Sequence, residues 1–224
     1  MRAKRRLSLN RITELKKAIF RELLVASVER NDPLQELASV VVHVTVGHVG
    51  PSASFLDSEG VPYLRTGNIG HGELLFDNML RVSPKFHGRL KKSQLKSGDV
   101  LFSRHISDEI RCAIVPATLG EANCANMIVI RPGPGILPEY LLNLITDESS
   151  QNSLLRRQVG TAQAVINTKV VQSWVVPIPP IEVQEALQAK MRSLTAMQKL
   201  QWASMKSIDG GFSSLQFRAF RGEL

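Results

Sequence analysis

Two short polar motifs, each placed after an apolar run of strand length, carry side chains that could bind nucleic acid. The motif "LRTGN" presents Arg65, Thr66 and Asn68, and the motif "FSRHIS" presents Ser103, Arg104 and His105. An arginine guanidinium donates two hydrogen bonds to guanine, and it also binds phosphate. We therefore predict that these two motifs contact DNA, with surface salt bridges of the two arginines as the competing interpretation.

A third polar stretch, "VGTAQAVINTK", follows a predicted helix. Gln163 can pair with adenine through two hydrogen bonds, and Thr161 can offer its methyl group to thymine or its hydroxyl to phosphate. Asn167 and Lys169 come shortly after them in the sequence. We predict that these four side chains contact DNA. The alternative is a turn with solvated side chains.

Further polar residues are candidate DNA contacts with weaker support. The segment "GEANCANM" is predicted to reach a groove through Asn123 or Asn126, although an asparagine in a turn more often only shapes the turn. Arg156 lies near the end of a predicted helix. It is either a phosphate contact or a charge that complements the helix C-terminus.

No catalytic site and no metal site are predicted. The sequence has no GxxxxGK[ST] loop to hold a nucleotide. In "PIPP", Ile178 occupies the position where an adenine methyltransferase motif needs a polar acceptor. His43 and His48 have no third ligand. Asp108 and Glu109 are interpreted as a solvated charge pair. We therefore predict a chain that is not itself an enzyme and holds no cofactor.

The composition favours an anionic partner and a reducing compartment. The chain has 28 Lys and Arg against 20 Asp and Glu residues, a net charge of +8, and such a basic balance favours binding to a polyanion. Cys112 and Cys124 form no CxxC pair and are predicted to be reduced packing residues. No run of 18 apolar residues and no signal-peptide pattern occurs, so a cytoplasmic location without membrane association is expected.

The pattern of apolar residues predicts an α+β fold. The spacing of Ile12, Leu15 and Ile19 predicts a helix over residues 8–28, which "ERNDP" ends. Short apolar runs between residues 34 and 180 predict strands, with one helix over residues 138–157. We predict an N-terminal amphipathic helix at 1–30, a domain with a twisted, mostly antiparallel sheet at 31–180, and a long helix with a tail at 181–224.

The long C-terminal helix needs a partner for its apolar side. It is expected to end at Gly210 and Gly211, after about 26 residues or roughly 39 Å. The partner is the N-terminal helix, a second copy of the chain, or both; folding back on the sheet is the alternative. The predicted contact residues of the two helices are Ile12, Leu15, Ile19, Leu187, Met191, Leu194 and Met197.

The order of these motifs resembles the specificity subunit of type I restriction-modification systems. The resemblance covers most of residues 32–224 and is carried by "GVPYLRTGNI" (60–69), "LKSGDVLFSR" (95–104), "ILPEYLLNLI" (136–145), "VGTAQAVINTKVV" (159–171), "VPIPPIEVQEAL" (176–187) and "FRAFRGEL" (217–224). It implies a target recognition domain that reads double-stranded DNA, followed by a spacer helix.

The resemblance also implies partners. A DNA methyltransferase (modification) subunit would use S-adenosylmethionine, and a restriction and translocation subunit would use ATP and magnesium. The usual subunit carries two recognition domains, whereas this chain has one and is similar to a half-subunit, which we expect to form a homodimer or to pair with a second half-subunit. The competing hypotheses are a stand-alone small DNA nuclease and a protein scaffold that no longer reads DNA.

Overall fold

The computed structural model describes residues 2–105, 110–156 and 165–221, with side chains described for 11–105, 110–156, 165–204 and 220–221. It divides into two compact units. The first, which we call the two-helix unit, contains residues 1–25 and 185–224. The second, the sheet unit, contains residues 26–184.

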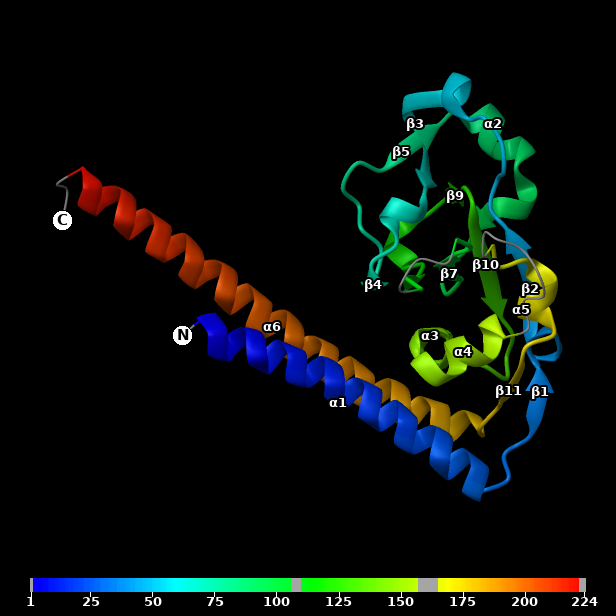
Figure 1. Cartoon of the computed structure of the whole chain (residues 1–224). Coiled ribbons are helices and arrows are strands. Elements are labelled where there is room, and N and C mark those ends of the chain that lie inside the picture. Colours follow the sequence, from blue (N-terminus) through cyan, green and yellow to red (C-terminus); the bar gives the residue numbers. More distant parts are fainter. Residues whose placement is uncertain (1, 106–109, 157–164, 222–224) are drawn as a thin grey trace. The chain divides into compact units, whose positions relative to one another are not determined.

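Two long helices, side by side and antiparallel, make up the two-helix unit (Figure 1). The helix predicted over 8–28 is present and longer: α1 spans Arg2–Glu29. The predicted helix end at Gly210 and Gly211 is wrong, because α6 spans Ile181–Phe220. A glycine inside a helix costs about 1 kcal/mol relative to alanine but keeps its backbone N–H and C=O groups, so two glycines weaken a helix without ending it.

Apolar and polar contacts together hold the two helices. Ile12 and Phe20 of α1 and Leu187 and Met191 of α6 are buried. The Lys16 Nζ atom donates to Gln198 Oε1 at 2.9 Å, and Gln198 Nε2 donates to Thr13 Oγ1 at 3.2 Å. This polar cluster fixes which turn of α1 lies beside which turn of α6.

Three sheets form the sheet unit, and most neighbouring strands are antiparallel, as predicted. A five-stranded sheet has the order β2-β10-β7-β8-β4, a four-stranded sheet the order β5-β3-β9-β6, and β1 pairs with β11. Only the β3–β9 and β4–β8 pairs are parallel among the described residues. The strands are β1 (Leu34–Glu36), β2 (Val41–Val46), β3 (Leu56–Leu64), β4 (His71–Gly72), β5 (Leu80–Val82), β6 (Gln94–Leu95), β7 (Val100–Ser103), β8 (Cys112–Ile114), β9 (Ala122–Cys124), β10 (Met127–Pro132) and β11 (Val175–Pro177).

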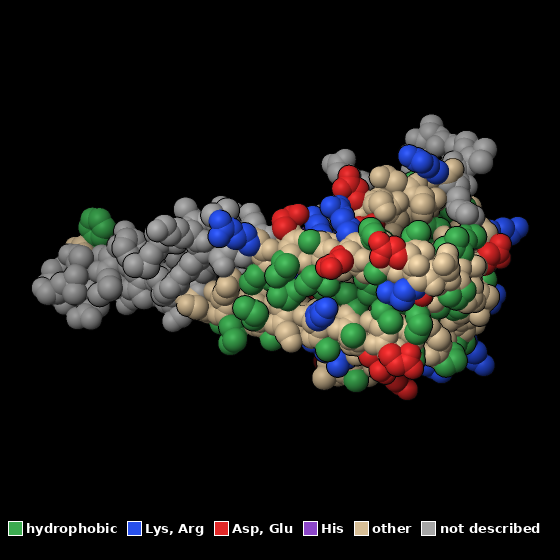
Figure 2. Space-filling model, turned by 90° about the horizontal axis from the view of Figure 1, so that it is seen from below, with side chains coloured by type: hydrophobic (Ala, Val, Ile, Leu, Met, Phe, Trp, Pro, Cys, Tyr) green, Lys and Arg blue, Asp and Glu red, His purple; other side chains and the backbone are tan. Residues whose placement is uncertain are grey.

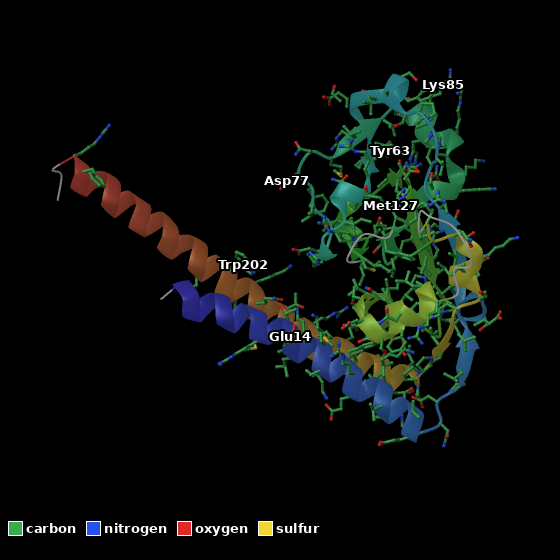
Figure 3. All side chains as sticks on the ribbon, in the orientation of Figure 1. Glu14, Tyr63, Asp77, Lys85, Met127 and Trp202 are labelled. Atoms are coloured by element: carbon green, nitrogen blue, oxygen red, sulfur yellow. The ribbon has the colours of Figure 1, made fainter. Side chains whose placement is uncertain are left out.

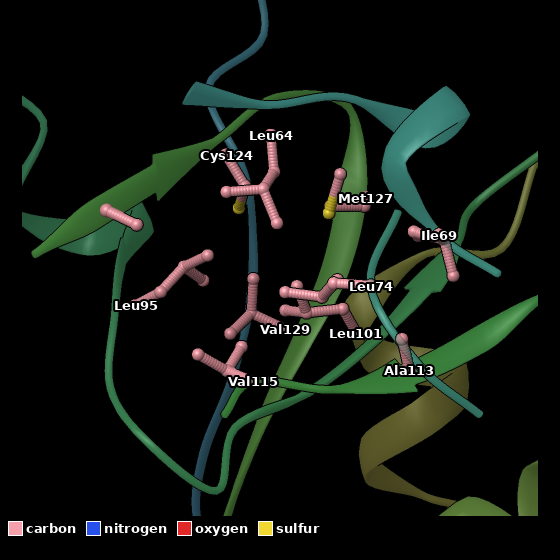
Figure 4. Close-up of a cluster of buried hydrophobic side chains, with 11 residues drawn as sticks. Leu64, Ile69, Leu74, Leu95, Leu101, Ala113, Val115, Cys124, Met127 and Val129 are labelled. Carbon is pink, nitrogen blue, oxygen red and sulfur yellow. The ribbon is translucent and has the colours of Figure 1, made fainter. Parts of the chain in front are cut away.

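The main apolar core of this unit draws side chains from both larger sheets (Figure 4). Leu64 and Leu95 come from the four-stranded sheet, and Leu101 and Val129 come from the five-stranded sheet. Cys124 belongs to the same cluster as a free thiol, and burial raises its pKa above the ordinary value. Both cysteines are buried and unpaired, which agrees with the prediction that they are packing residues.

The helices of the sheet unit are short. They are α2 (Pro84–Arg89), α3 (Pro138–Thr146), α4 (Glu148–Leu155) and α5 (Thr168–Gln172). The single helix predicted over 138–157 is divided, because Asp147 adopts an extended conformation (φ −73, ψ 130) and its carboxylate accepts a hydrogen bond from the Ser150 amide. The aspartate therefore caps a second helix instead of continuing the first.

Buried polar side chains join the segment around the start of α3 to β11 and to the start of α6. The Gln184 side chain is fully buried; it accepts from the Leu137 amide at 2.9 Å and donates to the carbonyls of Gly135 and Pro179. The Tyr140 hydroxyl donates to the Pro177 carbonyl at 2.7 Å.

Within the residues that the structure describes, no helix has the length and hydropathy that crossing a membrane requires.

Candidate nucleic-acid interface

The first predicted motif forms a 3-10 turn directly after β3, over Thr66–Asn68. Its side chains have different surroundings, since Arg65 is exposed, Thr66 is half-buried and Asn68 is buried. Arg65, Thr66, Gly67, Asn68, Asp77 and Asn78 line a shallow pocket of about 390 Å³. The turn therefore presents Arg65 and Thr66 to solvent beside a hollow in the surface.

Asn68 is a structural residue of this turn, and the prediction that it contacts DNA is not supported by its position. Its Oδ1 atom accepts from the Arg65 amide at 2.9 Å, and its Nδ2 atom donates to the carbonyls of Leu75 and Asp77 at 3.0 and 3.3 Å. Because these bonds occupy the side-chain amide on the inside of the turn, Asn68 holds the segment before β5 against the end of β3.

The second predicted motif lies beside the third. The Ile166 amide donates to the Arg104 carbonyl at 2.8 Å, and His105 forms an isolated bridge with Val165. The fold thus brings Ser103, Arg104 and His105 next to the segment that contains Asn167 and Lys169, although about 60 residues separate them in the sequence. We call residues 103–105 and 165–169 the paired loops.

In the paired loops, some polar side chains are exposed and others form hydrogen bonds within the loops. His105 and Lys169 are exposed, and Ser103 and Arg104 are half-buried. The Ser103 hydroxyl donates to the His105 carbonyl at 3.0 Å, which bends the loop. The exposed Asn167 side chain accepts from the Val170 amide at 2.9 Å and thereby caps α5, which leaves its NH₂ group and one lone pair of Oδ1 for a ligand. Thr161 and Gln163 lie outside the described residues.

Asn123 does not face solvent, so the prediction that it reaches a groove is wrong. Its side chain is fully buried because residues 122–124 form β9, an inner strand of the four-stranded sheet, and not a turn. The Nδ2 atom lies 3.3 Å from His87 Nδ1 and donates to the Leu90 carbonyl at 3.4 Å. Asn123 therefore positions the segment that follows β5.

Arg156 is exposed at the C-terminal cap of α4. This position agrees with both interpretations of the sequence, since an exposed cation at a helix C-terminus stabilises the helix and is also free to meet a phosphate. No ion pair involving Arg156 occurs within the described part of the chain.

One set of cations was not singled out from the sequence. Residues 85–96 contain five Lys and Arg residues and no Asp or Glu. A net charge is a sum over the chain and does not show where charge gathers; a scan for runs of one sign would have found this segment. The cations are Lys85, Arg89, Lys91, Lys92 and Lys96.

A buried ion pair supports the strand connections of the same unit. The Arg131 guanidinium donates to both Asp99 carboxylate oxygens, at 2.8 and 2.7 Å, and Asp99 also accepts from the Lys96 amide at 2.8 Å. His43 lies near this pair, and burial, together with the Arg131 charge, lowers the pKa of its imidazole. No group of three or more metal-binding side chains is found among the described residues.

Comparison with known proteins gives the class to which this sheet unit and its loops belong. Residues 41–205, more than half of the chain, match the family model described as the type I restriction modification DNA specificity domain. The chain therefore belongs to this family.

Two relatives illustrate how much of a full subunit the chain represents. It is 22% identical over 177 residues to the type I restriction enzyme MjaVIII specificity subunit of Methanocaldococcus jannaschii, a match that covers 75% of this chain and 41% of that protein. It is 25% identical over 176 residues to the EcoKI specificity subunit of Escherichia coli K12, covering 74% and 38%. The chain thus spans about two fifths of the length of these relatives.

Solved structures share the fold. The S subunit of a type I restriction-modification system from M. genitalium matches with a TM-score of 0.58 and 12% identity, over 95% of this chain and 56% of that one. The HsdS subunit from Thermoanaerobacter tengcongensis matches with a TM-score of 0.53 and 17% identity, over 99% and 57%. The predicted α+β fold is confirmed.

Proposed function

We propose that this chain is the DNA-recognition component of a type I restriction-modification complex and contributes one half-site reader. The observation that carries the proposal is the family match, which spans the sheet unit from β2 onward and reaches into α6. The relatives named above are specificity subunits. The match gives no support to the stand-alone nuclease.

The base-reading residues are proposed to come from the Arg65 turn and the paired loops. Both places offer polar side chains on loops that a rigid sheet holds, which is how many binding sites are built. Arg65, Thr66, Arg104 and His105 are the proposed readers, with Thr161 and Gln163 retained as predictions. The proposed phosphate contacts are Ser103, Arg156, Asn167 and Lys169.

The catalytic steps are assigned to other subunits. A modification subunit would supply S-adenosylmethionine-dependent methyl transfer, and a restriction subunit would supply ATP-driven translocation with magnesium. We propose that this chain, which is not itself catalytic, brings both to their DNA site, in the cytoplasm where that DNA lies.

Self-association, or pairing with a second half-subunit, is proposed to complete the reader. The chain spans only about two fifths of its relatives' length, and the two-helix unit exposes large apolar side chains. Hydrophobic side chains are also visible on the face seen from below in Figure 2. A twofold dimer would give a symmetric site with half-sites about one DNA turn apart. The exposed apolar residues include Leu15, Met197, Leu200 and Trp202.

The proposal is tested by mapping methylated sites in cells that express the chain with its modification subunit. Arg65→Ala and Arg104→Ala are expected to relax the recognised sequence at individual positions, because each removes a base contact worth about 1–3 kcal/mol. Arg156→Ala is the matched control and should lower methylation without changing the sequence. If Arg65→Ala and Arg104→Ala both leave the methylated sequence unchanged, these two arginines are not base readers. If the unaltered chain directs no methylation, the proposed function is wrong.

Assembly is tested by light scattering on the same chain. A mass of twice the 24.8-kDa chain, together with binding of the modification subunit, is the expected result. A monomer that binds no modification subunit would contradict the half-subunit proposal.

A further inference from the structure

A second surface of the sheet unit gathers positive charge. We call residues 85–96 the basic segment: it contains α2 apart from Pro84, the 3-10 turn Lys91–Ser93 and β6. Its five cations are all exposed. Lys85 and Arg89 are four residues apart in α2, so they lie on one side of that helix, whereas Phe86 between them is buried.

One carboxylate follows this segment on a neighbouring strand: Leu95 lies opposite Ala122, and the next residues of the two strands are Lys96 and Glu121. Within the described residues, no salt bridge involves any of the five cations. The nearest acidic residues in the sequence are Asp77 and Asp99, and Asp99 is buried and paired with Arg131. The basic segment therefore presents a net positive surface over 12 residues.

The basic segment is held from inside by a set of hydrogen bonds. Asn123 contacts His87 and Leu90, and Gln94 Nε2 donates to the His87 carbonyl at 3.1 Å. The Ser83 hydroxyl accepts from the Phe86 amide at 3.3 Å and caps α2. These bonds tie the cations to β9, so the segment loses little backbone freedom when it binds a ligand. Cations held at fixed positions favour a ligand whose charges are regularly spaced.

The basic segment and the Arg65 turn are different surfaces. In Figure 3, Asp77, which lines the pocket of the Arg65 turn, and Lys85 lie on opposite sides of Tyr63, and Lys85 points away from the unit. Lys85 therefore does not line the pocket of the Arg65 turn.

We propose that the basic segment contacts the phosphates of duplex DNA beside the bases that the loops read. The proposal rests on the proposed function in that DNA is the ligand. A reader in the major groove, about 12 Å wide, has phosphates of both strands at its sides, and cations outside its reading loops are the groups that would contact them. Such contacts position the unit and add affinity that does not depend on sequence.

The test is the salt dependence of binding by the full chain to a duplex of random sequence, between 50 and 200 mM salt. Each phosphate contact adds about 0.9 to the slope of log K against log salt. The variant Lys85→Gln, Lys91→Gln, Lys92→Gln is expected to lower that slope by about 2 to 3 and the affinity at low salt at least tenfold. Unchanged thermal unfolding would show that the variant folds.

A matched control removes the same charge from the two-helix unit. Arg11→Gln, Lys17→Gln, Lys190→Gln replaces three exposed cations and is expected to leave the slope within about 0.5 of the unaltered chain. An equal fall in both variants would overturn the proposal, because net charge alone would then explain the effect.

The remaining outcomes separate the two proposals. If the unaltered chain binds DNA and the basic-segment variant keeps its slope, the phosphate surface is wrong and the proposed function stands. If that variant keeps its slope but no longer binds the modification subunit, the segment meets an acidic protein surface and the proposal is overturned. If the unaltered chain shows no salt-dependent DNA binding, the proposed function fails and the inference fails with it.

Discussion

The two units differ in where their polar side chains lie. Among the described residues, the buried polar side chains belong to the sheet unit, whereas both units expose large apolar ones. The buried polar residues include Asn68, Asp99, Asn123 and Gln184, and the exposed apolar residues include Leu34 and Phe76 of the sheet unit and Leu15, Met197, Leu200 and Trp202 of the two-helix unit. The buried groups fix the loops of the sheet unit, and the two-helix unit has no comparable buried polar side chain among the described residues.

The largest effect is expected from breaking the buried ion pair. Asp99→Ala leaves the Arg131 guanidinium without its partner in a nearly buried site. Such a change costs about 3–5 kcal/mol. Denaturant unfolding of the variant and the unaltered chain measures the loss, and Glu121→Ala, an exposed carboxylate, is the control. A loss for Asp99→Ala as small as that of the control would show that the pair does not stabilise the unit.

The next effect concerns the exposed apolar residues. Met197→Glu with Leu200→Glu places two charges where self-association would bury apolar side chains, and we expect the association constant to fall roughly 100-fold, about 2.7 kcal/mol. Sedimentation or light scattering as a function of concentration measures it. Ala186→Glu, at an exposed position of the same helix about three turns before Met197, should change association little. Equal self-association of both variants would move the interface elsewhere.

Asn123→Ala tests whether a buried amide holds the basic segment. The substitution removes the donor to the Leu90 carbonyl and the acceptor of the Cys124 amide, which should cost about 1–3 kcal/mol. Thermal unfolding measures this loss. Asn126 is exposed with φ 54, so Asn126→Gly should be close to neutral because glycine adopts that conformation without strain. The idea fails if the two variants unfold at the same temperature.

The smallest effect is a pH dependence at His43. Burial, with the Arg131 charge, lowers the pKa of His43 in the fold below its ordinary value of 6.5. The folded state therefore disfavours the charged imidazole, so this contribution to stability is present above pH 6.5 and is lost as the pH falls. Unfolding measured from pH 7.5 to 5 should show a smaller loss in His43→Gln than in the unaltered chain. If the stability of the two chains falls equally between pH 7.5 and 5, the prediction is wrong.

Much of the fold follows from the sequence, since apolar spacing and turn residues indicate both long helices and most strands. The misses have local causes. At Asp147 a capping side chain divides a periodic segment, and at Gly210 and Gly211 helical neighbours override a weak breaker. In each case the sequence shows the residues involved, but it does not show which of two competing local interactions is stronger.

The candidate site was less predictable. Arg65 and Asn68 are three residues apart, yet one is exposed and the other is buried, because the direction of a side chain in a turn depends on which backbone groups it can reach. The proximity of Arg104 to Ile166 comes from strand order, which a local motif does not contain. The burial of Asn123 follows from its inner strand.

The pairing of β1 with β11 has a consequence for how such a chain can change. Leu34 lies opposite Pro177, and the Ile178 amide donates to the Pro33 carbonyl at 3.0 Å, so the segment between them starts and finishes at adjacent points. A segment with neighbouring ends can be exchanged for another of different length and composition without moving the residues on either side of the junction. Recombination at this strand pair would therefore replace residues 34–177, which carry the loops proposed above to read DNA, and would keep the segments on either side.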